Sequence, residues 1–323
     1  MSSANEAILH VARGAERLCT NVARVLQGKP DVIRDAVVCL LAEGHLLLED
    51  VPGTGKTSLA RALASSLSVS WNRIQFTPDL LPSDVTGVSI YNQATSVFEF
   101  RRGPVFANVV LADEINRASP KTQSALLEVM EEGTVSTDSQ VHPMPRPFMV
   151  VATQNPIDME GTYALPEAQL DRFLMRLAVG YPDPHAEATM LRTEKSGPTV
   201  AHLPPVLSGL DVSAMVETVK RVEVAPALEQ YIVGIAVATR TRPELRLGVS
   251  PRGSLALLRA ARAAAAVAGR AYVVPEDVKT LAGVVLAHRL ILRPEAELRG
   301  HTAAELVERA IESVPVPRAL PSS

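Results

Sequence analysis

The fold is decided by the stretch His45-Leu46-Leu47-Leu48-Glu49-Asp50-Val51-Pro52-Gly53-Thr54-Gly55-Lys56-Thr57-Ser58. It reads as a buried strand of three leucines, then a glycine-rich loop, then the start of a helix. In a loop of this kind successive backbone N–H groups face a phosphate at a helix N-terminus. The stretch therefore predicts a phosphate-binding P-loop.

Each residue type in the predicted P-loop has a physical role. Lys56 can reach the β- and γ-phosphates of a nucleotide, and the Thr57 hydroxyl can ligate Mg²⁺. The strict motif begins with glycine, whereas this chain has Asp50, a residue that tolerates a positive φ less well. The candidate nucleotide-binding residues of the loop are Gly53, Thr54, Gly55, Lys56, Thr57 and Ser58.

A second apolar run, Val109 to Ala112, ends in the acids Asp113 and Glu114. Asp113 can hold Mg²⁺ through its water shell, so Thr57 and Asp113 are the candidate metal residues, and Glu114 can polarise an attacking water. A lone Asp-Glu pair after a strand is commonly a solvated turn. Its position after a P-loop favours the catalytic interpretation.

A third apolar run, Met149 to Ala152, leads into Thr153-Gln154-Asn155-Pro156. An amide at the carboxyl end of a parallel strand lies where ligands bind, so Asn155 could hold the lytic water near the γ-phosphate. Taken alone, Asn155-Pro156 would indicate only a turn.

Strand patterns alternate with helical patterns through the first half of the chain, which predicts an α/β fold with a parallel sheet. Proline and glycine interrupt the pattern between Tyr181 and Leu210, and the remainder reads as helical. We expect an N-terminal helix over 1–24, an α/β core over 25–182, a linker over 183–209 and a helical domain over 210–323. The expected strands are Leu46–Leu48, Arg73–Gln75, Val109–Ala112 and Phe148–Ala152, and the expected helices of the second domain are Val212–Arg221, Ala227–Thr239, Ser254–Ala268, Glu276–His288 and Ala303–Ser313.

Composition excludes several classes of protein. The chain has 323 residues, a net charge of -3 and two cysteines. The cysteines form no C-x-x-C pair, so the sequence suggests neither a disulfide framework nor a zinc knuckle. No apolar run is long enough to cross a membrane, so we expect a cytoplasmic protein without membrane insertion. The small basic patches at Arg101-Arg102 and at Arg240 and Arg242 lack interleaved aromatics, and we expect no nucleic-acid binding.

Six segments together resemble MoxR-type AAA+ ATPases, and they span the chain from about Val25 to Arg289. They are VPGTGKT, LADEINRA, KTQSALLEVMEEG, VATQNP, GTYALPEAQLDRF and SPRG. The resemblance implies an AAA+ P-loop NTPase core followed by a small all-helical lid, with ATP and Mg²⁺ as cofactors. It also implies a homo-oligomeric ring, expected to be a hexamer, that hydrolyses ATP and acts as a chaperone-like remodeller or assembly factor.

The resemblance assigns roles to residues that the sequence alone leaves open. Asn155 is similar to sensor 1, Arg172 in LDRF to the arginine finger offered to a neighbouring subunit, and Arg252 in SPRG to sensor 2. Without the resemblance, both arginines would be interpreted as helix-surface salt bridges. Arg176 is close enough to be a rival finger, and Arg252 could act on its own subunit or on a neighbour. The adenine contacts stay open, because Gln27-Gly28-Lys29 could touch the base or be a plain exit from a helix.

The stretch Val88 to Phe100 places β-branched and aromatic residues on both sides of a polar tip, which predicts a hairpin. It corresponds to the family's helix-2 insert, which implies a partner contact, and the resemblance points to a von Willebrand factor A-domain protein as that partner. Two other functions stay open. They are an AAA+ motor that acts on DNA and a nucleotide-dependent scaffold with negligible turnover.

Overall fold

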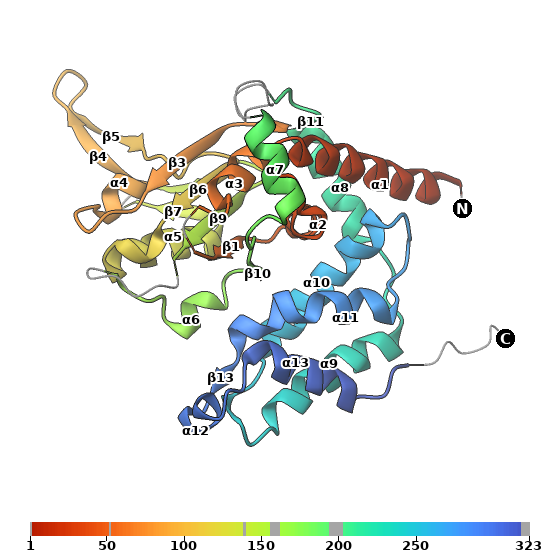
Figure 1. Ribbon diagram of the computed structural model, residues 1–323. Helices are drawn as coiled ribbons and strands as arrows, with labels where there is room; N and C mark the ends of the chain where they lie inside the picture. Colours follow the sequence, from red (N-terminus) through yellow and green to blue (C-terminus); the bar gives the residue numbers. More distant parts are fainter. Residues whose placement is uncertain (1, 52, 138–139, 156–161, 194–202, 318–323) are drawn as a thin grey trace.

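The computed structural model describes residues 2–51, 53–137, 140–155, 162–193 and 203–317. Figure 1 shows an α/β part built on one parallel sheet and, beside it, a helical part formed by the second half of the chain. The predicted fold class, a parallel α/β core followed by a small helical domain, is confirmed. Residues 194–202 of the predicted linker lie outside the described residues.

Five parallel strands form the central sheet, in the order β10-β1-β9-β6-β3. Four of them fall at the predicted runs, and β10 was not predicted. It has only three residues and lies at the edge of the sheet, so it lacks the long apolar run that marks the central strands. The strands are β1 (Leu46–Glu49), β3 (Trp71–Gln75), β6 (Val109–Asp113), β9 (Met149–Gln154) and β10 (Met175–Leu177).

Both faces of the central strands β1, β6 and β9 are buried, which explains why these strands read as continuous apolar runs. Leu46 and Leu48 pack on one face with α2 (Pro30–Leu41) and α3 (Lys56–Ser65). Leu47 points to the other face, where α5 (Pro120–Glu132) covers it. The period of two along β1 therefore places one helical layer on each side of the sheet.

Several short helices and strands lie outside the central sheet. An antiparallel hairpin of β4 (Gly87–Asn92) and β5 (Val97–Arg102) projects away from the sheet in Figure 1. The others are β2 (Leu67–Ser68), α4 (Pro82–Thr86), β7 (Thr134–Ser136), β8 (Val141–Pro143), α6 (Glu167–Leu170), α7 (Pro184–Thr193) and β11 (Leu207–Ser208). The helix α7 occupies the first part of the stretch that was predicted to be a linker.

The first helix, α1 (Ser2–Ala23), joins the two parts of the molecule. Its buried side chains recur at helical spacing, and it packs against α2 of the core and against α8 (Gly209–Lys220) and α10 (Pro251–Val267). The buried Asn21 also donates hydrogen bonds to the Ser66 hydroxyl (2.9 Å) and to the Pro204 carbonyl (3.0 Å). One continuous hydrophobic cluster therefore extends from the sheet through α1 into the helical part.

The helical part consists of α8, α9 (Pro226–Arg240), α10, α11 (Pro275–Leu286) and α13 (Ala303–Ser313), with the short α12 (Pro294–Leu298) and a ribbon of β12 (Leu245–Leu247) and β13 (Ile291–Leu292). Four of these helices begin earlier than predicted: α8 begins at Gly209, three residues early, and α9, α10 and α11 begin one to three residues early. The last three share a feature. Each starts at a proline, which suits the first turn because that position needs no N–H donor. The alanines of α10 are mostly buried and allow close packing on α1 and α11.

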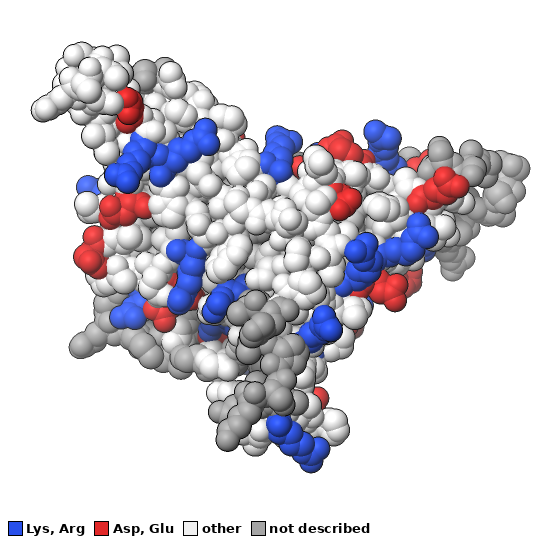
Figure 2. All heavy atoms as spheres, turned by 90° about the horizontal axis from the view of Figure 1, so that it is seen from above, with Lys and Arg blue, Asp and Glu red and all other residues white. Residues whose placement is uncertain are grey.

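The face shown in Figure 2 carries basic and acidic side chains interspersed with one another, without a continuous basic stripe. Among the described residues, no helix combines the length and the apolar character that a membrane span requires.

Candidate nucleotide site

The glycine loop between β1 and α3 is shaped by two glycines in the left-handed region. Gly53 has a φ of 85° and Gly55 a φ of 92°, values that other residues rarely adopt. A Cβ on Gly53 would meet no atom within 4 Å, so this side of the loop is open to a ligand. Helix α3 begins directly after Gly55, and its first residues, Lys56 to Ser58, line a cleft together with the two glycines.

Asp50 stands where the strict P-loop motif has glycine, but its backbone does not adopt the positive φ that this replacement led us to expect. It is not among the described non-glycine residues with a positive φ. Its carboxylate instead accepts hydrogen bonds from the N–H groups of Val51 (2.7 Å) and Gly180 (2.5 Å). The acid therefore ties the start of the loop to the segment that follows β10.

The Lys56 ammonium donates hydrogen bonds to the carbonyl oxygens of Asp50 and Val51. Partial burial lowers the pKa of Lys56, and the nearby carboxylates of Asp50 and Asp113 oppose that shift. The Thr54 hydroxyl also bonds back to the Val51 carbonyl (3.1 Å), so its side chain stabilises the loop. Ser58 lines the cleft in front of the loop.

Asp113 lies at the end of β6, with its carboxylate facing the Thr57 hydroxyl. The Thr57 Oγ1 atom is 3.4 Å from each carboxylate oxygen. The hydroxyl and the carboxylate therefore face the same space, where Thr57 could ligate Mg²⁺ and Asp113 could hold the ion through its water shell. Among the described residues, no group of three or more His, Cys, Asp or Glu could hold a metal.

Two neighbours hold Asp113 in place, and neither was predicted from the sequence. The Thr153 hydroxyl donates to its Oδ1 atom (2.6 Å), and Arg73 donates to its Oδ2 atom through Nε (3.1 Å) and Nη2 (2.6 Å). Asp113 is buried, so these bonds compensate for its lost hydration. Arg73 belongs to the predicted strand Arg73–Gln75. Residues two apart on a strand lie on the same face, so the sequence could have predicted that Arg73 and Gln75 point to the same side of the sheet.

Glu114 is the first residue beyond β6 and adopts a left-handed φ of 56°. Its N–H donates to the Thr153 hydroxyl (2.9 Å), so a single threonine fixes both acids. Its carboxylate accepts hydrogen bonds from Gln75 (3.0 Å) and Arg117 (3.1 Å). Glu114 is therefore held at the mouth of the cleft by two side chains whose contacts were not predicted from the sequence.

Asn155 follows β9 and lines the same cleft as the glycine loop and the two acids. Its carbonyl oxygen accepts a hydrogen bond from Asn116 (3.1 Å). The ends of β1, β3, β6 and β9 converge here around a volume of about 420 Å³, within the usual range of ligand pockets. The structure thus brings together Lys56, Thr57, Asp113, Glu114 and Asn155, as the sequence analysis expected.

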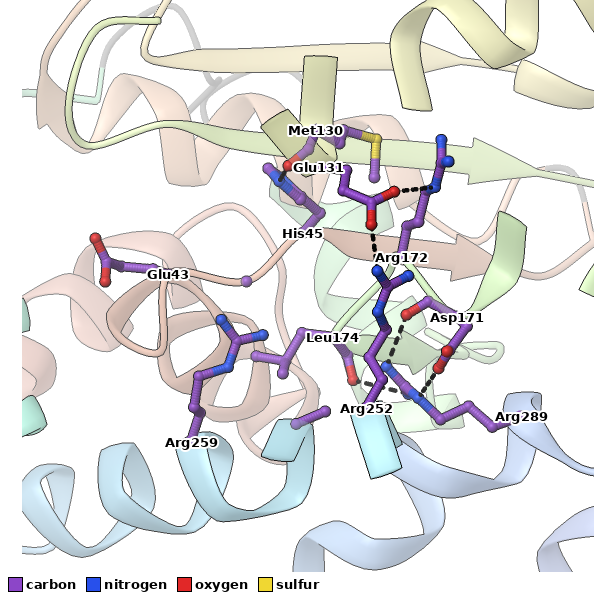
Figure 3. Close-up of a pocket in the computed structure, with 12 residues that line it drawn as sticks. Glu43, His45, Met130, Glu131, Asp171, Arg172, Leu174, Arg252, Arg259 and Arg289 are labelled. Carbon is purple, nitrogen blue, oxygen red and sulfur yellow. Dashed lines mark hydrogen bonds and ion pairs between the residues drawn. The ribbon is translucent and has the colours of Figure 1, made fainter. Parts of the chain in front are cut away.

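The two arginines assigned by resemblance lie elsewhere. Arg172 and Arg252 line a second cavity of about 210 Å³, together with His45 and Leu174, which precede β1 and β10 (Figure 3). This is the amino edge of the sheet, opposite to the glycine loop. Arg176, the rival finger, lies on β10 and is 3.4 Å from the Glu49 carboxylate of the same chain.

The β4–β5 hairpin includes the whole predicted insert, residues 88–100, and its surface is strongly apolar. Phe98 is 73% exposed, and its ring packs 5.3 Å from that of Tyr91. Val88, Ile90 and Val97 are also exposed. Leu26, which directly precedes the segment Gln27-Gly28-Lys29, lies next to Gly55 and bounds one side of the loop.

Comparisons with known proteins agree with this geometry. The family model "ATPase family associated with various cellular activities (AAA)" matches residues 45–175, and the model "AAA lid domain" matches residues 237–310. The chain is 51% identical to the uncharacterized protein YeaC of Bacillus subtilis, over 92% of this chain and 93% of YeaC. It is 42% identical to Chaperone MoxR1 of Mycobacterium tuberculosis, over 94% and 82% of the two chains, and 33% identical to Protein MoxR of Methylorubrum extorquens, over 94% and 95%. A crystal structure from Cytophaga hutchinsonii, solved as a candidate ATPase, superposes with a TM-score of 0.89 at 38% identity and covers 98% of this chain and 99% of its own.

Proposed function

This chain is a member of the MoxR family of AAA+ ATPases, and on that premise we propose that it hydrolyses ATP with Mg²⁺ to drive the remodelling of partner proteins. The observation that carries the proposal is the convergence of Lys56, Thr57, Asp113 and Glu114 in one cleft. A chaperone role is supported by the name of one relative, MoxR1. We further propose that it works in the cytoplasm as a hexameric ring.

In the proposed reaction the chain first binds the nucleotide phosphates. The N–H groups from Gly53 to Thr57 receive the β-phosphate, and Lys56 turns from the carbonyl oxygens of its own loop to the β- and γ-phosphates. Thr57 and Asp113 would hold Mg²⁺, which would neutralise charge on the phosphate oxygens. The lowered pKa of Lys56 reflects its burial, which these phosphates would offset.

Glu114 then polarises the attacking water while Asn155 holds that water near the γ-phosphate. The carboxylate of Glu114 is engaged by Gln75 and Arg117 in this structure. It must exchange at least one of these bonds for the water before hydrolysis. The position of Glu114 along the backbone is already set by Thr153.

Two variants test the assignment. Lys56→Ala should abolish tight ATP binding, because it removes charge that acts on the bound phosphates. Glu114→Gln should bind ATP and hydrolyse it slowly, because it removes only the group that acts on the water. Nucleotide binding and phosphate release are the measurements, and wild-type behaviour of both variants would refute the site.

We also propose that the catalytic site is shared between subunits. Arg172 and Arg252 lie at the amino edge of the sheet, and β1, about 13 Å long at ~3.3 Å per residue, separates them from the glycine loop of the same chain. Both would therefore act on the nucleotide of a neighbour, with Arg172 as the finger. A finger arginine is worth on the order of 10³–10⁵ in rate.

Arg172→Ala should bind ATP normally and lose most turnover. Mixing it with Lys56→Ala protein should restore some activity, since mixed interfaces combine an intact loop with an intact finger. Hydrolysis per wild-type subunit should also rise with protein concentration as rings assemble. A dilute monomer with full activity would contradict the shared site.

The partner contact is proposed for the β4–β5 hairpin, with a von Willebrand factor A-domain protein as the partner. Exposed aromatic residues such as Tyr91 and Phe98 are typical of protein contacts. Replacing Asn92–Ser96 with a short Gly-Ser turn should leave ATP binding intact and abolish both co-purification and partner-stimulated hydrolysis. Equal capture and stimulation would show that the hairpin only covers the core.

Affinity capture on Glu114→Gln protein loaded with ATP would identify the partner. The other candidate functions give different results. A DNA motor would bind DNA with an affinity that falls steeply with salt. A scaffold would bind ATP but show negligible hydrolysis in a single-turnover assay.

A further inference from the structure

Helix α5 connects the segment that follows Glu114 with the cavity that contains Arg172 and Arg252. Its 13 residues extend about 20 Å at 1.5 Å per residue. Near its start, the buried Gln123 donates hydrogen bonds to the carbonyl oxygens of Ile115 (3.3 Å) and Ala118 (3.2 Å), just beyond Glu114. Near its end, Glu131 faces the cavity that contains Arg172 and Arg252.

The carboxylate of Glu131 joins these two arginines (Figure 3). Its Oε2 atom lies 2.9 Å from Arg172 Nε, and its Oε1 atom accepts a hydrogen bond from Arg252 Nη2. Arg172 comes from the segment before β10, whereas Arg252 comes from the first turn of α10. One acid therefore connects side chains of the α/β part and the helical part.

The other acids around the cavity are engaged elsewhere. Glu43 is paired with Lys220 (2.7 Å) and lies 3.9 Å from Arg146. Asp171 is engaged by Arg289, whose Nε lies 2.7 Å from its Oδ1. Arg259, on the same face of α10 as Arg252, has no hydrogen bond or ion pair within the described residues. Without Glu131, the guanidinium groups of Arg172 and Arg252 would share a small cavity with two further arginines, and like charges would drive them apart.

The backbone beneath Glu131 is fixed by His45. The N–H of Val150 donates to His45 Nδ1 (3.0 Å), so the proton is on Nε2, which donates to the carbonyl oxygen of Met130 (3.0 Å). The last turn of α5 is thereby tied to the sheet one residue before Glu131. A carboxylate on a rigid base holds its partners more accurately than one on a mobile loop.

We propose that Glu131 is a positioning residue that sets Arg172 and Arg252 as a pair toward the nucleotide of the neighbouring subunit. This inference rests on the proposed shared ATPase site. Glu131 takes one donor from each guanidinium, and each group has five, so donors are left for phosphate oxygens. Through α5, the pair is also mechanically connected to the segment that follows Glu114 of its own subunit.

The test compares Glu131→Ala and Glu131→Gln with Glu128→Gln, which changes an exposed acid one turn earlier on the same helix. Both Glu131 variants should bind ATP as wild type does, because their own glycine loop is unchanged. Their kcat should fall by about tenfold to 100-fold, the cost of misplacing a catalytic group by about 1 Å. The control should keep the wild-type kcat.

A mixing experiment separates positioning from a general loss of structure. Glu131→Ala protein mixed with Lys56→Ala protein should regain turnover, because the Lys56→Ala subunit offers correctly placed arginines to an intact loop. If the substitution instead damaged α5, the ATPase site of the same subunit would be impaired, and mixing would not restore turnover. Arg172→Ala mixed with Lys56→Ala shows that subunits exchange.

Three results would overturn the inference. They are a kcat of both Glu131 variants equal to that of the Glu128 control, a kcat above wild type, and a failure of mixing to restore turnover when the Arg172 mixture succeeds. An increase would mean that Glu131 restrains the arginines rather than aims them. A wild-type protein that hydrolyses no ATP would instead refute the proposed function, and the inference with it.

Discussion

Acid should destabilise this protein through the imidazole of His45, which is buried between β9 and the end of α5. Burial lowers the pKa of His45 from 6.5 to about 4, because the charged ring would lose its hydration. The unfolded chain binds a proton on this residue near pH 6.5, whereas the folded chain does so only near pH 4. Stability is therefore retained above pH 6.5 and lost as the pH falls toward 4.

The size of the effect follows from the shift of about 2.5 pH units. At 1.36 kcal/mol per unit, His45 should account for about 3 kcal/mol of lost stability between pH 6.5 and pH 4. His45→Gln removes the titrating group. The variant should be less stable at pH 7 by about 1–3 kcal/mol, since one of the two buried hydrogen bonds is weakened.

Urea unfolding followed by circular dichroism, without nucleotide and at several pH values from 4 to 7, measures both proteins. The stability advantage of wild type over His45→Gln should shrink by about 3 kcal/mol as the pH is lowered. Burial also lowers the pKa of His288, but that residue is present in both proteins and cancels in the difference. An advantage that stays constant to within about 1 kcal/mol across this range would refute the reasoning.

Three further substitutions probe other features. Thr153→Val removes the hydroxyl that bonds both Asp113 and Glu114, so ATP hydrolysis should fall by about tenfold to 100-fold while ATP binding persists, as measured by turnover and nucleotide titration. Gly283→Ala, in the interior of α11 where a Cβ meets no atom within 4 Å, should raise the free energy of unfolding by about 0.5–1 kcal/mol in urea titrations. Gly87→Ala places a Cβ 2.3 Å from a carbonyl oxygen at a φ of 101°, so the β4–β5 hairpin should become sensitive to proteolysis, and an unchanged digestion pattern would contradict this.

The nucleotide cleft was predictable because its parts lie at the ends of local patterns. Lys56 and Thr57 follow one apolar strand, and Asp113 and Glu114 follow another. In a parallel sheet the carboxyl ends of the strands meet at one edge, so the order of motifs along the chain was sufficient to bring them together. The sheet and the helical second part were predictable for the same reason, since periodicity marks long elements well.

Side-chain partners chosen by tertiary packing were not predictable. Arg73 and Gln75 reach the two acids only because Gln75 pairs in register with Asp113 across β3 and β6. The pairing of Arg172 and Arg252 through Glu131 depends on where the helical part sits against the sheet. No local pattern encodes that placement.

Helix α1 is synthesised well before some of the helices that it packs against. Its apolar side chains lie against α8 and α10, and α10 ends at Val267. At about 5–20 residues per second, ~12–50 s pass between completion of α1 and completion of α10. For that time α2 and the emerging sheet cover only part of its apolar stripe. During its own synthesis, a protein proposed to act on the surfaces of others carries an uncovered helix of the kind that aggregates or is held by chaperones.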